Sequence, residues 1–385
     1  MDFRLTDDQR ALRQGVRELL EGRFGRAALR AAVDRGEGER GGVLDRELWR
    51  ELGAAGFFAL RLPEADGGVG QGLPEAVLAF EEAGRVLLPG PLIATHLAAG
   101  AVAGAATGEV VVTSVDEGLV EWLDEADVVR GDTTGAEPLA SVDPLTPLHR
   151  LPASAAPRPA SGALRRPRTT GGPGGPPMSD GPGGFPVSDG PGGFRVSDGP
   201  GGFRVSDGPG GPPAPDGPGG SSVSDGSGGL PVPDALGSPA SPPAGDALLT
   251  SLLTAAEQLG SAARTCEAAV QHARTREQFG QPIGAFQAVQ HLCAGMLVRV
   301  EMARAAVYAA SVTADPVDIA AARLLADEAA VRGARDCLQV HGGMGFTWES
   351  DIHLHLKRAW IRTHRAGGTT RSEEELADDL PAGTA

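Results

Sequence analysis

Two short segments in the last third of the chain contain residue types that bind phosphate groups. The first contains, in chain order, Arg274, Arg276, Gln278, Phe279, Gly280 and Gln287. An arginine side chain can bind pyrophosphate through two parallel hydrogen bonds, and a glycine lets a ligand approach the backbone closely. This segment therefore fits a nucleotide-binding site. The alternative is a corner between two helices whose arginines are solvated.

The second segment, 339–346, has the sequence Gln-Val-His-Gly-Gly-Met-Gly-Phe. Adjacent glycines at 342 and 343, directly after a helix, are typical of a helix C-cap. Together with Gln339 and a third glycine at 345, they would also form a backbone surface that a dinucleotide can approach. The motif alone does not decide between these two interpretations.

Long helices are the elements that would position these segments. Between 247 and 385, apolar residues recur at helical spacing over 249–270 and again over 289–307. Pro316 is a suitable first residue for a third helix, and 349 to about 365 forms a fourth. Four long helices with short connections predict a C-terminal four-helix bundle over 247–385.

Residues 1–105 are predicted to form a helical N-terminal domain. Thr6 and Gln9 fit a capping box at the start of its first helix. Further helices are expected at about 45–53, from Pro74 onward and over 92–102, with a glycine-rich loop at 57–72.

Residues 106–151 differ from the helical region before them and have a composition typical of β-strands. Branched residues predict short strands at 109–114, 119–123 and 127–129, and the proline-containing stretch 139–151 is expected to be a loop between strands. Three short strands bury little surface by themselves. We therefore expect the start of a sheet inside a mostly α protein.

Residues 152–246 are of low complexity and hold most of the excess of glycine and proline, which number 57 and 31 in the whole chain. The unit Ser-Asp-Gly-Pro-Gly-Gly-Phe-Arg-Val occurs at 188–196 and again at 197–205. The unit matches neither the calcium-binding β-roll repeat nor the collagen repeat. Because such a composition buries too little apolar surface to offset its ordering entropy, we predict a disordered segment.

The overall composition excludes several classes of function. A net charge of −16 disfavours binding to nucleic acid and to anionic membranes. The first residues have no apolar signal region, and no stretch is long and apolar enough to cross a membrane, so a cytoplasmic protein is expected. Cys266, Cys293 and Cys337 lie in apolar helical stretches and are expected to be buried and inert, and no metal site is predicted.

The two glycine-containing segments, in this order, resemble the C-terminal domain of the acyl-CoA dehydrogenase family. The resemblance rests on Arg-x-Gln-Phe-Gly at 276–280, on Phe286-Gln287 and on Gln-x-x-Gly-Gly-x-Gly-Phe at 339–346. The stretches 56–70 and 81–85 are similar to the family's first domain. Residues 348–356 are similar to bacterial members that assemble from two unlike subunits, including members that act on steroid side chains.

This resemblance implies a helical N-terminal domain, a β middle domain and a C-terminal bundle, with FAD between the last two. Residues Arg276, Gln278 and Phe279 would contact the FAD pyrophosphate and adenosine, with Gln287 nearby. Residues Gln339, Gly342 and Gly343 would contact the ADP moiety from the neighbouring subunit. The implied activity is α,β-dehydrogenation of an acyl-CoA thioester, and the implied partners are the acyl-CoA and another acyl-CoA dehydrogenase-like subunit, in a homo- or hetero-oligomer.

The family's catalytic base is a glutamate at one of two positions, and neither position is acidic in this chain. Alignment to the motifs places Ala366 at the first position and Thr250 at the second. Glu257 and Asp351 are nearby carboxylates, for which we expect solvated or capping roles. His364 is a further candidate for the base, but it adjoins Arg365, which disfavours a protonated histidine.

This chain also contains only part of the family's middle domain. Its opening, 106–151, is recognisable, and the repeat of 152–246 follows in place of the rest. The leading hypothesis is a flavoprotein subunit that needs a partner subunit for the catalytic base. A second hypothesis is a conventional flavoenzyme with an unrecognised base. A third is a non-catalytic helical scaffold, or a degenerate pseudoenzyme that lost its flavin-binding sheet.

Overall fold

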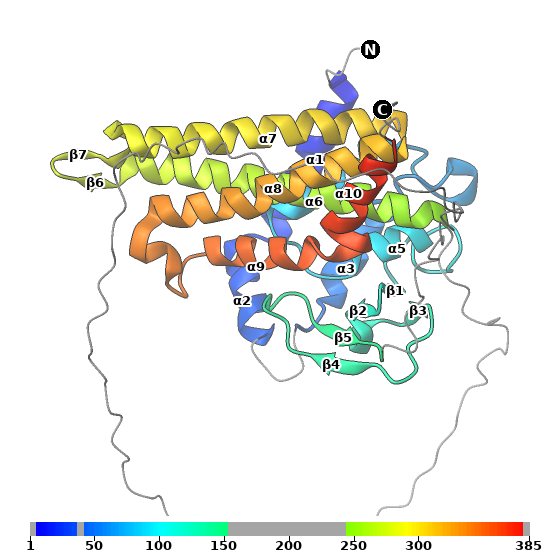
Figure 1. Cartoon of the computed structure of the whole chain (residues 1–385). Coiled ribbons are helices and arrows are strands. Elements are labelled where there is room, and N and C mark those ends of the chain that lie inside the picture. The colour runs from blue at the N-terminus through cyan, green and yellow to red at the C-terminus, as the bar shows by residue number, and fades with distance from the viewer. Residues whose placement is uncertain (1–4, 37–41, 153–243, 380–385) are drawn as a thin grey trace, which may run out of the picture. The chain divides into compact units, whose positions relative to one another are not determined.

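The computed structural model describes residues 5–36, 42–152 and 244–379 (Figure 1). The predicted repeat lies outside these residues, apart from a few at its two ends. The N-terminal helices are α1 (Asp7–Arg23), α2 (Arg26–Gly36), α3 (Arg46–Ala54), α4 (Leu73–Arg85) and α5 (Leu92–Ala98). The helical prediction for this region is confirmed, including the capping box, in which Thr6 and Gln9 exchange side-chain to backbone hydrogen bonds.

Two details of the N-terminal prediction were wrong. Helix α2 was not predicted, although Leu29, Ala32 and Val33 form its buried face at helical spacing. Helix α5 ends at Ala98 rather than at about 102, and turns follow it. The predicted glycine-rich loop at 57–72 contains one short 3-10 helix, η1 (Glu64–Asp66).

The β-like region forms a five-stranded sheet in the order β3-β1-β2-β5-β4. Its strands are β1 (Val112–Asp116), β2 (Leu119–Glu121), β3 (Val128–Arg130), β4 (Glu137–Leu139) and β5 (Leu148–Arg150), and a 3-10 helix, η2 (Leu123–Glu125), follows β2. The expectation of three strands, with a loop over 139–151, was wrong because β5 lies inside that stretch. Strand β5 has weak local signals and is fixed by antiparallel pairing with β2 on one side and β4 on the other.

The C-terminal region is built on α6 (Ala244–Thr275), α7 (Gln287–Thr313), α8 (Pro316–His341) and α9 (Ile352–Arg362), followed by α10 (Gly368–Asp379). Its first three helices pack side by side, and α9 packs against α8 (Figure 1). The mostly helical fold is thus confirmed. The predicted fourth helix is shorter than expected, and α10 was not predicted.

Glycines let α4 and α6 approach each other closely. A Cβ on Gly260 would lie 1.8 Å from the carbonyl oxygen of Glu81, and a Cβ on Gly84 would lie 2.0 Å from that of Glu257. No side chain fits between the two backbones, so both positions require glycine. This contact joins the N-terminal helices to the C-terminal bundle in one core.

The cysteines are all free. Cys266 and Cys337 are buried as expected, and burial raises their pKa values to about 11 and about 12, which keeps the thiols protonated. Cys293 is only partly buried. Within the described ranges, no helix has the length and apolarity needed to span a membrane, and no group of His, Cys, Asp and Glu is arranged to hold a metal ion.

Candidate functional site

The segment with Arg276, Gln278 and Phe279 forms a tight hairpin between α6 and α7. Strands β6 (Glu277–Gln278) and β7 (Gln281–Pro282) pair antiparallel, and a 3-10 helix, η3 (Ile283–Ala285), leads into α7 at Gln287. Phe279 and Gly280 form the turn, with φ of 55° and 78°. Two positive φ values match the twist of a two-residue hairpin. The turn leaves the Phe279 side chain 91% exposed.

The second segment begins where α8 ends. The Gly342 N–H donates to the carbonyl of Gln339, and Gly342 has a φ of 60°, so the predicted C-cap is present. The chain then continues in a 3-10 helix, η4 (Gly342–Phe346). Met344 and Phe346 are 60% and 70% exposed. The glycines therefore cap the helix and also open the backbone to solvent.

The structure brings the two segments to the same end of the bundle. The rings of His272, in the last turn of α6, and His341, at the end of α8, are stacked with centroids 4.1 Å apart. In Figure 1 the β6–β7 hairpin projects from this end. The predicted cofactor-binding residues are all exposed here; they are Arg276, Gln278, Phe279, Gln287, Gln339, Gly342 and Gly343.

This end of the bundle is open and carries exposed arginines. A Cβ built on Gly280, Gly342 or Gly343 would meet nothing within 4 Å. Arg276 forms no ion pair with any residue that the structure describes. Burial, together with the charges of His341 and Arg276, lowers the pKa of His272. The guanidinium group is thus available to an anionic ligand such as a pyrophosphate, and the glycines let the ligand approach the backbone closely.

A second feature, which the sequence analysis missed, is a row of arginines that joins α9 to the sheet. Arg358 forms an ion pair with Asp143 and donates to the carbonyl of Leu88 at 3.2 Å. Arg362 Nη1 lies 2.8 and 3.0 Å from the two carboxylate oxygens of Glu121. The available signal was the spacing of Arg358, Arg362 and Arg365, which puts all three on one helical face.

These charges continue as an alternating chain, Glu257–Arg362–Glu121–Arg365–Asp116. Arg362 Nε is 2.7 Å from Glu257 Oε2, Arg365 Nη1 is 3.1 Å from Glu121 Oε2, and Arg365 Nε is 3.7 Å from Asp116 Oδ2. Three carboxylates face two guanidinium groups, so this row of side chains carries one excess negative charge. Burial raises the pKa of Asp116, whereas Arg362 and Arg365 outweigh burial at Glu121 and lower its pKa.

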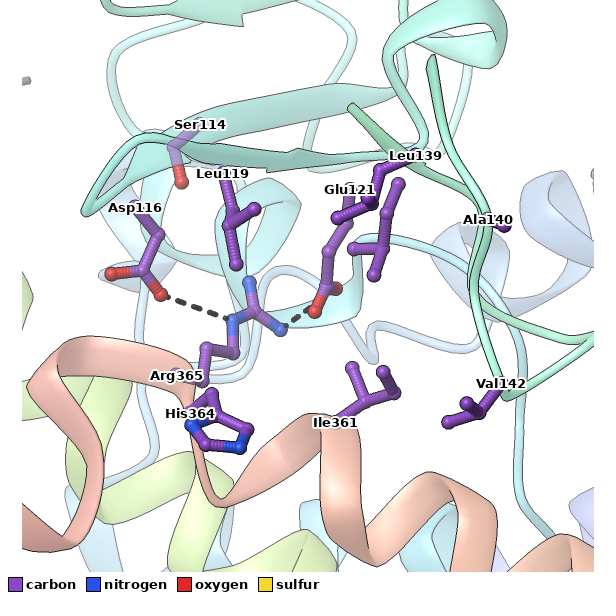
Figure 2. Close-up of a pocket in the computed structure, with 11 residues that line it drawn as sticks. Ser114, Asp116, Leu119, Glu121, Leu139, Ala140, Val142, Ile361, His364 and Arg365 are labelled. Atoms are coloured by element: carbon purple, nitrogen blue, oxygen red, sulfur yellow. Dashed lines mark ion pairs between the residues drawn. The ribbon is translucent and has the colours of Figure 1, made fainter. Parts of the chain in front are cut away.

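At Asp116, this row of charged side chains borders a cavity of about 200 Å³ (Figure 2). Ser114, Asp116, Glu121, His364 and Arg365 supply its polar groups. Its apolar wall consists of Leu119, Leu139, Ala140, Val142, Leu148 and Ile361. Strands and α9 thus enclose a space with charge at one side and hydrocarbon at the other.

The position expected to hold the family's base lies beside this cavity. Ala366 belongs to a 3-10 helix, η5 (Arg365–Gly367), is 8% exposed and has a left-handed φ of 54°. Its backbone N–H donates to Asp116 Oδ2 at 2.9 Å. The second expected position, Thr250, lies in α6, where its carbonyl accepts a hydrogen bond from Thr254 Oγ1.

The two alternative carboxylates have roles other than those expected. Glu257 is neither solvated nor capping, because it is 6% exposed and forms the ion pair with Arg362. Asp351 precedes α9 without making a capping hydrogen bond, and it forms ion pairs with Arg26, at 2.6 Å, and with Arg30. Both carboxylates are thus held by arginine side chains, and neither lines the cavity.

Comparison with known proteins decides the family. The family model for the N-terminal domain of acyl-CoA dehydrogenases matches residues 6–110, and the model for their C-terminal domain matches residues 249–375. The chain is 30% identical over 359 residues to acyl-CoA dehydrogenase IpdE2 of Mycolicibacterium smegmatis, covering 92% of this chain and 93% of the relative. The chain belongs to the acyl-CoA dehydrogenase family.

Solved structures agree with this acyl-CoA dehydrogenase fold. The ChsE4–ChsE5 complex of Mycobacterium tuberculosis contains a chain that matches with a TM-score of 0.66 at 21% identity, over 100% of both chains. The structure of PigA with FAD and proline matches with a TM-score of 0.65 at 15% identity, over 99% of both chains. The described sheet lies between the ranges that the two family models match.

Proposed function

We propose that this chain is a flavoprotein subunit for the α,β-dehydrogenation of an acyl-CoA thioester, and that it works in an assembly with a second acyl-CoA dehydrogenase-like subunit. The observation that carries the proposal is the exposed pair of motif segments at one end of the bundle. Family membership supplies the reaction class. The fold it shares with the FAD complex of PigA supports FAD as the cofactor.

The residues at this end fit the adenosine and pyrophosphate half of FAD. Arg276 would bind the pyrophosphate, and Gln278 and Phe279 would contact the adenosine. Gln339, Gly342 and Gly343 would contact the ADP moiety of an FAD held in the neighbouring subunit, and Gln287 would lie nearby. When bound, FAD supplies the acceptor for the β-hydride of the substrate.

An assembly of unlike subunits accounts for two features of the chain. The motif residues are exposed, and Arg276 has no ion-pair partner among the described residues, as expected of groups that meet a cofactor at a subunit boundary. The chain that matches in the ChsE4–ChsE5 complex belongs to an assembly of two proteins, which supports the same arrangement here. An electron acceptor would reoxidise the flavin.

The proposal includes the interpretation of 106–151 as the remnant of a β middle domain that the Gly/Pro repeat interrupts. The base is then either a carboxylate of the second subunit, as the sequence analysis favours, or a carboxylate of this chain outside Ala366, Thr250, Glu257 and Asp351. A cytoplasmic location fits the proposed soluble assembly.

The test is co-expression of the full chain with a second acyl-CoA dehydrogenase-like subunit encoded beside it. We expect a yellow complex with a flavin spectrum that reduces an artificial electron acceptor when an acyl-CoA is added. The Arg276→Ala complex should lose FAD affinity by about 10- to 100-fold, because a charge-assisted hydrogen bond contributes about 1.5–3 kcal/mol.

Arg332→Ala is the matched control, since the Arg332 side chain is 65% exposed on α8 and, among the residues that the structure describes, pairs with Glu328 alone. This variant should keep wild-type FAD affinity. A complex that remains colourless after reconstitution with FAD would instead support the non-catalytic scaffold.

A further inference from the structure

The cavity beside η5 contains a carboxylate that no family motif marks. Asp116 ends β1, its side chain is 24% exposed, and it lines the cavity. The Ala366 N–H, 2.9 Å away, fixes one of its oxygens. In Figure 2 the Asp116 carboxylate points toward the guanidinium group of Arg365. A fixed, partly exposed carboxylate in a cavity has the placement that a general base requires.

A hydrogen-bond donor lies next to this carboxylate. Arg365 is 7% exposed, and its Nε, 3.7 Å from Asp116 Oδ2, has no hydrogen-bond acceptor within the described part of the chain. Its Nη1 is held by Glu121 at 3.1 Å, so the guanidinium group is fixed in orientation. A buried donor without an acceptor costs free energy unless a ligand satisfies it. A carbonyl oxygen would satisfy it, and an enolate oxygen would do so more strongly.

The apolar wall identifies the rest of the ligand. The side chains of Leu119, Leu139, Val142, Leu148 and Ile361 face the charged side across about 200 Å³. This volume suits a short acyl chain with its carbonyl at the polar side. The excess negative charge of the ion chain disfavours an acyl group that carries a second carboxylate.

We propose that Asp116 is the catalytic base of this chain and that Arg365 Nε binds the thioester oxygen of the substrate. This inference rests on the proposed acyl-CoA dehydrogenation. In the step, the Cα–H bond breaks and an O–H bond forms on Asp116. The electron pair of the broken bond moves into the enolate, whose oxygen is stabilised by the Arg365 guanidinium group.

The charges around Asp116 suit this role. Burial raises its pKa and Glu121 adds to the increase, while Arg365, the Ala366 N–H and Arg323 oppose it. A base is more effective when its pKa lies closer to the working pH than that of a solvated carboxylate. The rate at which the Cα protons of a bound acyl-CoA exchange with solvent should therefore increase with pH as Asp116 loses its proton.

The experiment measures exchange of the Cα protons of butyryl-CoA in D2O by mass spectrometry, using the full chain in its co-expressed complex. Wild type should incorporate deuterium. Asp116→Asn, which still accepts from the Ala366 N–H, should slow exchange by about 100-fold or more, the usual range for loss of a general base. Asp116→Glu should restore part of the rate. Glu117→Gln, which makes the same charge change at the adjacent exposed residue, should exchange at the wild-type rate.

Three results would overturn the inference. The first is equal exchange in wild type and Asp116→Asn, and the second is no exchange in wild type. The third is loss of exchange in His364→Gln with full exchange in Asp116→Asn. Dehydrogenation by an Asp116→Asn complex at the wild-type rate would reject Asp116 as base but leave the proposed function intact. A wild-type complex with neither flavin nor dehydrogenation would reject the proposed function itself.

Discussion

Arg362 Nη1 donates to Glu121 at 2.8 Å, and the two residues are 241 positions apart in the sequence. The Arg362 side chain is 2% exposed and that of Glu121 is 10% exposed. Arg362 comes from α9 and Glu121 from β2, so this ion pair fastens the sheet to the bundle. Because both charges are desolvated, each depends on the other for its stability.

Removal of one partner should destabilise the protein strongly. Glu121→Gln leaves Arg362 and Arg365 with less negative charge in a buried position. We expect the free energy of unfolding to fall by about 3 kcal/mol, at the lower end of the range for broken buried pairs because Glu257 remains beside Arg362. Urea denaturation followed by circular dichroism would measure it.

Glu328→Gln provides the comparison, because its pair with Arg332 is exposed. Such surface pairs contribute little to stability, and the free energy of unfolding should change by no more than about 1 kcal/mol. Equal stability losses in the two variants would contradict the view that burial makes the Glu121 pair important.

The contact between α4 and α6 predicts a steric effect. In Gly260→Ala, the new Cβ would lie 1.8 Å from the carbonyl oxygen of Glu81, so the helices must separate. We expect a loss of about 3 kcal/mol or more in the free energy of unfolding, since overpacking against rigid backbone cannot be relieved by a rotamer change. Thermal and urea unfolding would both report it.

Gly295→Ala in α7 is the matched substitution. Its nearest contact is the flexible tip of Arg299, at 3.6 Å. Alanine in a helix interior stabilises by about 0.5–1 kcal/mol relative to glycine, so this variant should be slightly more stable than wild type. A stabilised Gly260→Ala variant would show that the close approach of α4 and α6 does not exist in solution.

His355 predicts a defined pH dependence. Burial, together with Arg264, Arg358 and Arg85, lowers its pKa to about 3, and its Nδ1 lies 2.9 Å from Ser261 Oγ. The folded state keeps this residue neutral, whereas the unfolded chain takes up a proton below a pKa of about 6.5. Stability is therefore lost as pH falls through the unfolded pKa, and the loss continues down to the folded pKa.

Between pH 7 and pH 5, wild type should lose about 2 kcal/mol more stability than His355→Gln, which has no group that titrates there. Urea titrations of both proteins at each pH would measure the difference. Parallel pH profiles for the two proteins would show that His355 is protonated in the folded state as readily as in the unfolded state.

Most helices and the two motif segments could be predicted because their signals are local. The capping box of Thr6 and Gln9, Pro316 at the start of α8, and the apolar spacing of α6 and α7 depend only on neighbours within a few residues. Helix α2 was missed although its apolar spacing is local, whereas strands β4 and β5 were missed because each has only 3 residues. Strand β5 exists through its pairing with β2, which no local pattern encodes.

The sequence by itself therefore determined the mostly helical fold and the family, since both rest on local composition or on motif order, and it predicts the residues that would contact FAD. Only the tertiary structure decided which charges meet. Glu257 forms an ion pair with Arg362, and Asp116 accepts a hydrogen bond from the N–H of Ala366, 250 positions away. The physical reason is that an ion pair forms between side chains that folding brings within a few ångströms, whatever their separation along the chain.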